Sequence, residues 1–435
     1  MLLSRDRVDR SDPTSMKLIA LVLPLFAMTP RVLAQSPEVA PAINQFGLDL
    51  LRIQPSANTP GNLLLSPYSI EAALAMAWTG ADGVTRDEMR RVLHFAGNDA
   101  AVVNAFSALA RELRAISGAS PTSAEIPGQK GIPVPRVDLS VANRLFAQSG
   151  FAVQPEFIRG LRDDFGAPLE ELDFSHAPEP SRRKINDWVA DQTHRRITDL
   201  VPAGALNEMT RLVLANAIYL KAPWMTPFEP EATKPEAFWV GGSVGNRVPT
   251  MQQQDDFHFG KRSGYSAIAL PYEGGALQFL ILLPDERNGL ARFERIVTPA
   301  LLAECTRLPS CDVVLHLPRF KLEPPSMPLG SLLKRLGMTT ASDQPPGSAD
   351  FSRMAQRKPN EYLCVSEVIH KAWLALDEAG TEAAAATATV MMVGCAVPSP
   401  RPPPIEVRVD HPFLFAIQHV PSGACLFLGR VEDPR

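Results

Sequence analysis

Two serine patterns in this chain match motifs that position a nucleophile for hydrolysis. Ser243 stands within residues 241–245, a G-x-S-x-G pattern whose chemistry needs a strained turn from a strand into a helix. The residues that follow, 246–249, are not a helix start, which favours a glycine-rich hairpin turn instead. Ser331 and Lys334 form an S-x-x-K pattern without the S-D-N and K-T-G segments that accompany it in enzymes. A serine hydrolase that uses Ser243 is therefore a weak hypothesis.

The histidines and cysteines do not show the spacing of a metal site. The eight histidines are scattered and lack an H-E-x-x-H pattern, and no cysteine spacing resembles a zinc site. We therefore expect no metal and no cofactor. Mostly free or buried thiols are the favoured interpretation, although Cys305 and Cys311 could close a small loop. The five cysteines are Cys305, Cys311, Cys364, Cys395 and Cys425.

A stretch near the C-terminus, DEAGTEAAAATATVMMVGCA at residues 377–396, is short of both charge and bulk between Glu382 and Val390. As a strand it could enter a packed sheet without overfilling the layers around it, and no proline interrupts it before Pro398. The stretch is compatible with two states, an exposed loop and an inserted strand. By composition alone, an ordinary surface helix or a flexible linker is about equally favoured.

The elements that must position these residues are helical early in the chain and extended late in it. Apolar periodicity predicts helices at 38–52, 82–93, 99–116 and 180–194, and a further helix opened by Ser66 and Pro67. Residues 117–137 are predicted to be a loop. Strands are predicted at 137–146, 211–220, 265–271, 276–283, 312–320, 405–409, 412–419 and 425–431. This order, without repeats or linkers, predicts an α+β fold in a single domain over residues 35–435.

The first 34 residues are predicted to be a secretory signal region. Met16 and Lys17 precede an apolar run and small residues that end at Ala34, which fits export to the extracellular space or the periplasm. Translation from Met16 and a long polar leader are both consistent with the residues before it. The apolar run is too short for a bilayer, so we expect no membrane partner. The formal charge of -4 argues against nucleic acid as a partner.

Several segments together resemble the serpin family of serine protease inhibitors, over nearly all of the chain from about residue 38 onward. The stretch EAGTEAAAATA from Glu378 is similar to the hinge of the reactive loop in that family. The other matching segments are NLLLSPYSI (62–70), LANAIYLKAPW (214–224), LPY (270–272), LLP (282–284), DHPFLF (410–415) and FLGRV (427–431). The resemblance implies several helices, three β-sheets and an exposed reactive-centre loop. KAPW at residues 221–224 departs from the usual K-G-x-W, so we expect the turn there to differ slightly from that of the family.

The resemblance also implies a mechanism and a set of site residues. A target protease would cleave the loop, stay attached as an ester, and be carried away as the loop inserts into the main sheet. By family spacing the scissile bond is Gly394–Cys395, with Met392, Val393 and Cys395 as alternatives for the specificity residue. The other residues are the hinge (Glu378, Gly380, Thr381, Glu382, Ala383, Ala384, Ala385, Ala386 and Thr387), a sheet-opening polar cluster (Ser66, Ser69, Asn216 and His370), and Trp224 at the start of insertion.

Small or medium apolar residues around the scissile bond suggest an elastase-like or subtilisin-like serine protease as the target, with a cysteine protease as an alternative. The inhibitor would act as a monomer, would form a covalent complex with the protease, and would need no catalytic residue of its own. A non-inhibitory serpin that acts as a binding protein remains the alternative function, although this hinge carries no residue that would impair insertion.

Overall fold

The computed structural model describes residues 39–54, 61–118, 136–242, 245–358, 361–382 and 403–435. The predicted signal region, the scissile bond with its alternatives, and hinge residues 383–387 lie outside the described residues. Those predictions therefore stay predictions.

The helices that were predicted from periodicity are confirmed, with ends that differ by a few residues. The second helix shows why the sequence starts it where it does, because Ser66 caps it by accepting a hydrogen bond from the Ser69 N–H at 3.2 Å and Pro67 occupies its first turn. The helices are α1 (Ala40–Ile53), α2 (Pro67–Gly80), α3 (Gly83–Val92), α4 (Asp99–Gly118), α5 (Pro155–Gly160), α6 (Pro178–Gln192), α7 (Leu290–Ile296), α8 (Pro299–Glu304) and α9 (Gly330–Leu336).

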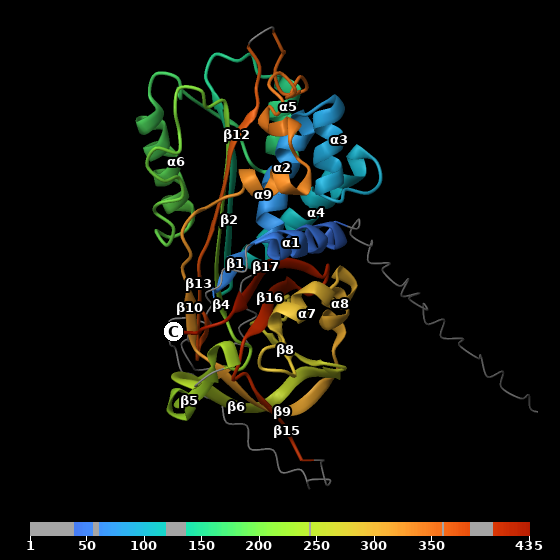
Figure 1. Cartoon of the computed structure of the whole chain (residues 1–435), viewed down its shortest axis with the longest axis vertical. Helices are drawn as coiled ribbons and strands as arrows, with labels where there is room; N and C mark the ends of the chain where they lie inside the picture. The colour runs from blue at the N-terminus through green and yellow to red at the C-terminus, as the bar shows by residue number, and fades with distance from the viewer. Residues whose placement is uncertain (1–38, 55–60, 119–135, 243–244, 359–360, 383–402) are drawn as a thin grey trace, which may run out of the picture. The chain divides into compact units, whose positions relative to one another are not determined.

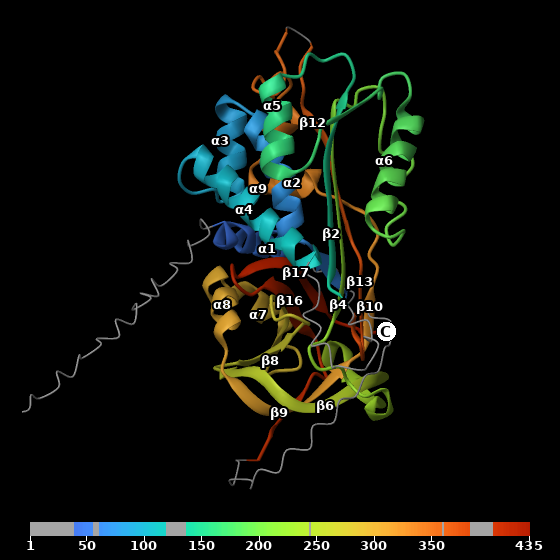
Figure 2. The same ribbon diagram turned by 180° about the vertical axis from the view of Figure 1, so that it is seen from behind.

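The main sheet consists of long strands that run side by side, with α6 on one face and α2 on the other (Figures 1 and 2). Strand β4 pairs with β2 along one edge, in antiparallel register, and with β12 along the other, in parallel register. The members of this sheet are β2 (Asp138–Gln148), β3 (Glu170–Leu172), β4 (Leu212–Pro223), β10 (Phe320–Leu322), β11 (Met327–Pro328), β12 (Val365–Ala372), β13 (Leu374–Asp377) and β14 (Gly380–Thr381).

The continuous apolar run of β4 reflects a strand that is buried on both faces. Leu214 and Ile218 belong to the large core that contains α2, whereas Val213, Ala215 and Ala217 belong to a second core beneath α6. Alternation along a strand sends neighbouring side chains to opposite faces, so both sets must be apolar.

The remaining strands form a second, nine-stranded set that contributes the other end of the molecule in Figure 1. The α+β class is confirmed, and two of the three expected sheets are joined through β6, which pairs with β5 through its first residues and with β7 through its last. The strands are β1 (Leu63–Leu65), β5 (Lys234–Trp239), β6 (Gly245–Arg262), β7 (Tyr265–Pro271), β8 (Leu277–Pro284), β9 (Ser310–Pro318), β15 (Ile405–Arg408), β16 (Phe413–His419) and β17 (Ala424–Val431).

The pairing of β5 with β6 decides the question raised by the G-x-S-x-G pattern. The two strands are antiparallel, with Trp239 opposite Gly245. The glycine-rich segment therefore connects the two strands of a hairpin. A nucleophile elbow requires a helix after the serine, whereas a strand begins at Gly245. Ser243 itself lies outside the described residues.

Among the described residues, no helix is both long enough and apolar enough to cross a membrane. The described cysteines, Cys305, Cys311, Cys364 and Cys425, are all free, so the small loop that Cys305 and Cys311 could have closed is not formed. In the same part of the chain, no group of His, Cys, Asp or Glu side chains is arranged to hold a metal ion.

Candidate functional site

The start of the predicted hinge already forms a short strand within the main sheet. Gly380 and Thr381 make up β14, which turns back on β13 so that Thr381 lies opposite Leu376. On its other edge β14 pairs with the end of β4, with Gly380 opposite Pro223 and Thr381 opposite Ala222. Two hinge residues therefore separate β13 from β4, at the end of the sheet that the loop leaves.

Glycine is required at position 380 by the closeness of β4. The φ angle of Gly380 is +149°, which side chains strongly disfavour. A Cβ atom there would lie 2.2 Å from the Ala222 carbonyl oxygen and 2.7 Å from the Pro223 Cα, both of which are backbone atoms. The space between β13 and β4 therefore admits the hinge only while residue 380 has no side chain.

An aromatic pair surrounds the side chain of Thr381 in β14. Thr381 is fully buried, and its hydroxyl is hydrogen-bonded to the Tyr272 hydroxyl at 2.6 Å. Trp224 stacks on Tyr272 with ring centroids 4.7 Å apart, and its Nε1–H donates to the Asp377 carbonyl at 3.0 Å. Trp224 thus links the end of β4 to the last residue of β13. Its predicted role at the start of insertion stays a prediction.

Charged side chains hold the hinge on both sides of β14. The Glu378 carboxylate accepts from the Thr233 hydroxyl at 2.7 Å and lies 3.6 Å from the Arg319 guanidinium. Glu382, at a φ of +47°, pairs with Arg196 from the segment that follows α6. The second hinge carboxylate is thereby tied to the layer that covers the sheet.

The four residues of the predicted polar cluster are brought together, and a fifth residue, Asn143 of β2, joins them. Asn216 donates from Nδ2 to the Ser69 hydroxyl and to Asn143 Oδ1, each at 2.5 Å. Asn143 donates from Nδ2 to the Ser69 carbonyl at 3.0 Å, and its Oδ1 accepts from the Ser69 hydroxyl at 2.9 Å. The network therefore joins α2 to the neighbouring strands β2 and β4.

His370 extends this network to β12 and does so as a neutral ring. The Ser66 N–H donates to His370 Nε2 at 3.1 Å, so the proton lies on Nδ1, which donates to Asn216 Oδ1 at 2.5 Å. Burial lowers the pKa of His370 to about 3, which keeps the ring uncharged at neutral pH. His370 is directly opposite Asn216 in the parallel pair of β12 and β4. A strand that entered between β4 and β12 would have to break this bond.

These features agree with a comparison of the chain with known proteins. A family model described as "Serpin (serine protease inhibitor)" matches residues 41–434. The chain belongs to the serpin family. The hypothesis of a serine hydrolase is set aside accordingly, since the matching family is described as one of protease inhibitors and the strands on either side of Ser243 pair with each other.

This serpin matches individual relatives over nearly their whole length. It is 37% identical over 406 residues to the leukocyte elastase inhibitor of Bos taurus, with 91% of this chain and 100% of the relative covered. It is also 37% identical to Serpin B6 of Macaca fascicularis, with 91% and 99% covered. Among solved structures, Serpin48 of Tenebrio molitor is 29% identical with a TM-score of 0.76, covering 92% of this chain and 98% of that one. Uncleaved ovalbumin is 28% identical with a TM-score of 0.75, covering 91% and 100%.

Sequence reasoning did not identify four of the residues that make up the site. Tyr272 lay within a matching segment but had no assigned role, and Asn143 lay within a predicted strand. Arg196 and Arg319 gave no local signal, because each contacts the hinge only through the tertiary structure. Asn143 gave no clear signal either, because it is only half-buried and its strand alternates polar and apolar residues.

Proposed function

We propose that this serpin inhibits an elastase-like or subtilisin-like serine protease as a suicide substrate, and that it acts as a monomer through a covalent complex. The observation that carries the proposal is β14, the two-residue strand between β13 and β4. It supplies a start for insertion, and the slender residues that follow it can continue the same strand.

The dimensions of the main sheet suit this mechanism. Strand β4 has 12 residues, which corresponds to about 40 Å. Residues 381–394 would span roughly 45 Å when extended. A loop cleaved at Gly394–Cys395 could therefore run antiparallel along the whole of β4 and carry the attached protease to the opposite end of the sheet. Distortion of the oxyanion site of the protease would then stall deacylation, since losing one donor costs about a hundredfold or more in rate.

The side chains of β14 also predict which face each inserted residue would occupy. Thr381 points toward Tyr272 in the large core, and Glu382 pairs with Arg196 beside α6. Alternation then directs Ala383, Ala385, Thr387 and Thr389 toward the core, and the even-numbered alanines toward α6. The relatives named for elastase inhibition support the proposed target class.

The test is to mix the protein with an elastase, with subtilisin and with trypsin, and to separate the products on a denaturing gel. We expect a band at the summed mass with the elastase or subtilisin, and mass spectrometry of the released peptide should identify Gly394–Cys395, or a bond at Met392 or Val393. Thr381→Arg is the control for insertion, because a charged side chain cannot occupy this buried position, and it should give cleavage without the covalent band. Clean cleavage of the unmodified protein by every protease would favour the non-inhibitory alternative.

Export, to the extracellular space or the periplasm, is part of the proposal and rests on residues 16–34. N-terminal sequencing of the mature protein should find Gln35 first. A mature protein that starts at or before Met16 would contradict it.

A further inference from the structure

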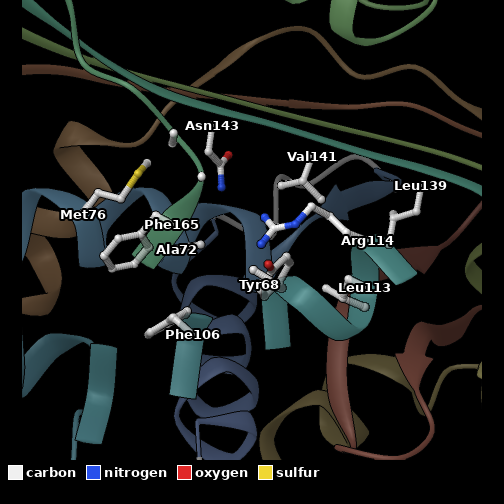
Figure 3. Close-up of a pocket in the computed structure, with 13 residues that line it drawn as sticks. Tyr68, Ala72, Met76, Phe106, Leu113, Arg114, Leu139, Val141, Asn143 and Phe165 are labelled. Atoms are coloured by element: carbon white, nitrogen blue, oxygen red, sulfur yellow. The ribbon is translucent and has the colours of Figure 1, made fainter. Parts of the chain in front are cut away.

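A cavity of about 180 Å³ lies between α2, α4, β2 and the π-helical turn η1 (Leu161–Phe165), and it shares no residue with the hinge. Most of the side chains that line it are apolar, as Figure 3 shows. An engineered apolar cavity of about 150 Å³ admits benzene. This cavity therefore has room for a ring or a chain of roughly six carbons. The apolar lining residues include Ala72, Met76, Phe106, Leu113, Val141 and Phe165.

Two hydrogen-bond donors face the cavity without a partner. Arg114 is exposed, and no described carboxylate pairs with its guanidinium. Tyr68 is only 4% exposed, yet within the described part of the chain its hydroxyl has no hydrogen bond. Burial raises the pKa of Tyr68, so the hydroxyl stays protonated. Figure 3 shows the guanidinium of Arg114 directed toward the Tyr68 hydroxyl.

The other polar groups of the cavity do not compete for a ligand. Asn143 lines it, but both ends of its amide are engaged with Ser69 and Asn216. Gly166 leaves room for the guanidinium, since a Cβ at this residue would lie 3.0 Å from Arg114 Nη1. The free polar groups are thus donors, and one of them is a cation. A ligand that satisfies both must present a hydrogen-bond acceptor, and the cationic guanidinium favours an anionic one.

We propose that this cavity binds a small amphiphilic carboxylate. The planar guanidinium of Arg114 would take the carboxylate oxygens, which it suits geometrically, and the Tyr68 hydroxyl would donate to one of them. The ring or short alkyl chain would fill the apolar interior between α2 and α4. A neutral apolar ligand would offer no acceptor to the buried Tyr68 hydroxyl and no charge to Arg114, and it therefore binds less tightly. The cavity shares Asn143 with the polar network but no residue with the hinge, and ligand binding here does not depend on the inhibitory function proposed above.

The test is calorimetric titration of the full-length protein with 3-phenylpropionate. The neutral analogue 3-phenylpropanol, which has the same carbon skeleton, is titrated in parallel. We expect the carboxylate to bind with a dissociation constant below about 1 mM and the alcohol to bind about tenfold more weakly, as for a hydrogen bond to a charged group. Equal affinity for the two ligands, or binding of neither, would overturn the proposal.

Three variants assign the site without disturbing the core. Arg114→Gln should weaken carboxylate binding about tenfold or more and leave alcohol binding unchanged. Arg111→Gln is the matched control, since Arg111 is an exposed arginine on the same helix outside the cavity, and it should change neither affinity. Tyr68→Phe removes only the hydroxyl and should weaken carboxylate binding severalfold. Equal losses in Arg114→Gln and Arg111→Gln would point to a general charge effect and overturn the assignment.

Discussion

Replacement of Gly380 by alanine should drive the hinge out of the main sheet. The added methyl group would lie 2.2 Å from the Ala222 carbonyl oxygen, whereas a favourable contact between carbon atoms is about 3.5–4.0 Å. Strand β4 has little freedom to withdraw, because β2 pairs with its other edge as far as Lys221. The hinge, which continues into the loop, is the part that can move.

The free energy involved follows from the bonds that the hinge would lose. One is the bond between the Thr381 and Tyr272 hydroxyls at 2.6 Å. Two others join backbone groups: the Trp224 backbone N–H donates to the Ala379 carbonyl at 3.0 Å, and the Glu382 backbone N–H donates to the Ala375 carbonyl at 2.9 Å. At about 0.5–1.5 kcal/mol each, they favour the seated hinge by roughly 1.5–4.5 kcal/mol. Their loss corresponds to a shift of about tenfold to a thousandfold in the population of seated hinges.

Two measurements report this shift. Trp224 fluorescence should change in Gly380→Ala, because the indole stacks on the tyrosine that Thr381 would leave. The stoichiometry of inhibition should rise, since a hinge that cannot re-enter gives cleaved inhibitor in place of the covalent complex. Gly330→Ala is the matched control, because a Cβ at this residue meets no atom within 4 Å. Unchanged emission and unchanged stoichiometry in Gly380→Ala would refute the argument from backbone contact.

Three further predictions concern buried or paired charges. Burial lowers the pKa of His370 to about 3, so below pH 6.5 the unfolded chain takes up a proton that the folded protein does not. The free energy of unfolding, measured in urea, should therefore fall by up to about 1.4 kcal/mol per pH unit between pH 6.5 and pH 3. His370→Gln should remove this slope, and a slope that persists would belong to another group. Burial raises the pKa of Glu71, whose carboxylate oxygens have no hydrogen-bond partner among the described residues. The free energy of unfolding should therefore fall as pH rises above 4.5, and Glu71→Gln should raise the urea midpoint at pH 8. Equal midpoints for the two proteins would contradict an unpartnered carboxyl. Arg196→Gln should remove the ion pair with Glu382 and destabilise the seated hinge by roughly 1 kcal/mol, since Arg196 is half-exposed. Trp224 fluorescence should therefore change in the same direction as in Gly380→Ala, but less. Unchanged fluorescence would show that the pair does not hold the hinge.

The local patterns of the sequence were sufficient for most helices and for several strands. Ser66 and Pro67 start α2 with a cap and a preset φ angle, and these act through neighbouring residues only. The apolar run of β4 was predicted as a central strand, because a strand buried on both faces must be apolar at every position. The hinge was identified from its small side chains and its resemblance to a family motif.

Strands without a local signal were missed. Strand β6 carries Pro249 and a polar run at residues 252–256, which are unfavourable for a strand, yet neighbouring strands pair along its length. Strand β12, which carries His370, was not predicted either. Its place is set by the parallel pairing with β4, between residues more than 150 positions apart along the chain.

The sequence by itself determined that residues after Glu382 are slender enough to enter a sheet, since side-chain volume is a property of each residue alone. Only the tertiary structure decided that the hinge begins between β13 and β4, that Tyr272 receives Thr381, and that Arg196 pairs with Glu382. The physical reason is that these contacts join segments distant in the chain, and packing of the whole domain, rather than local propensity, brings such segments together.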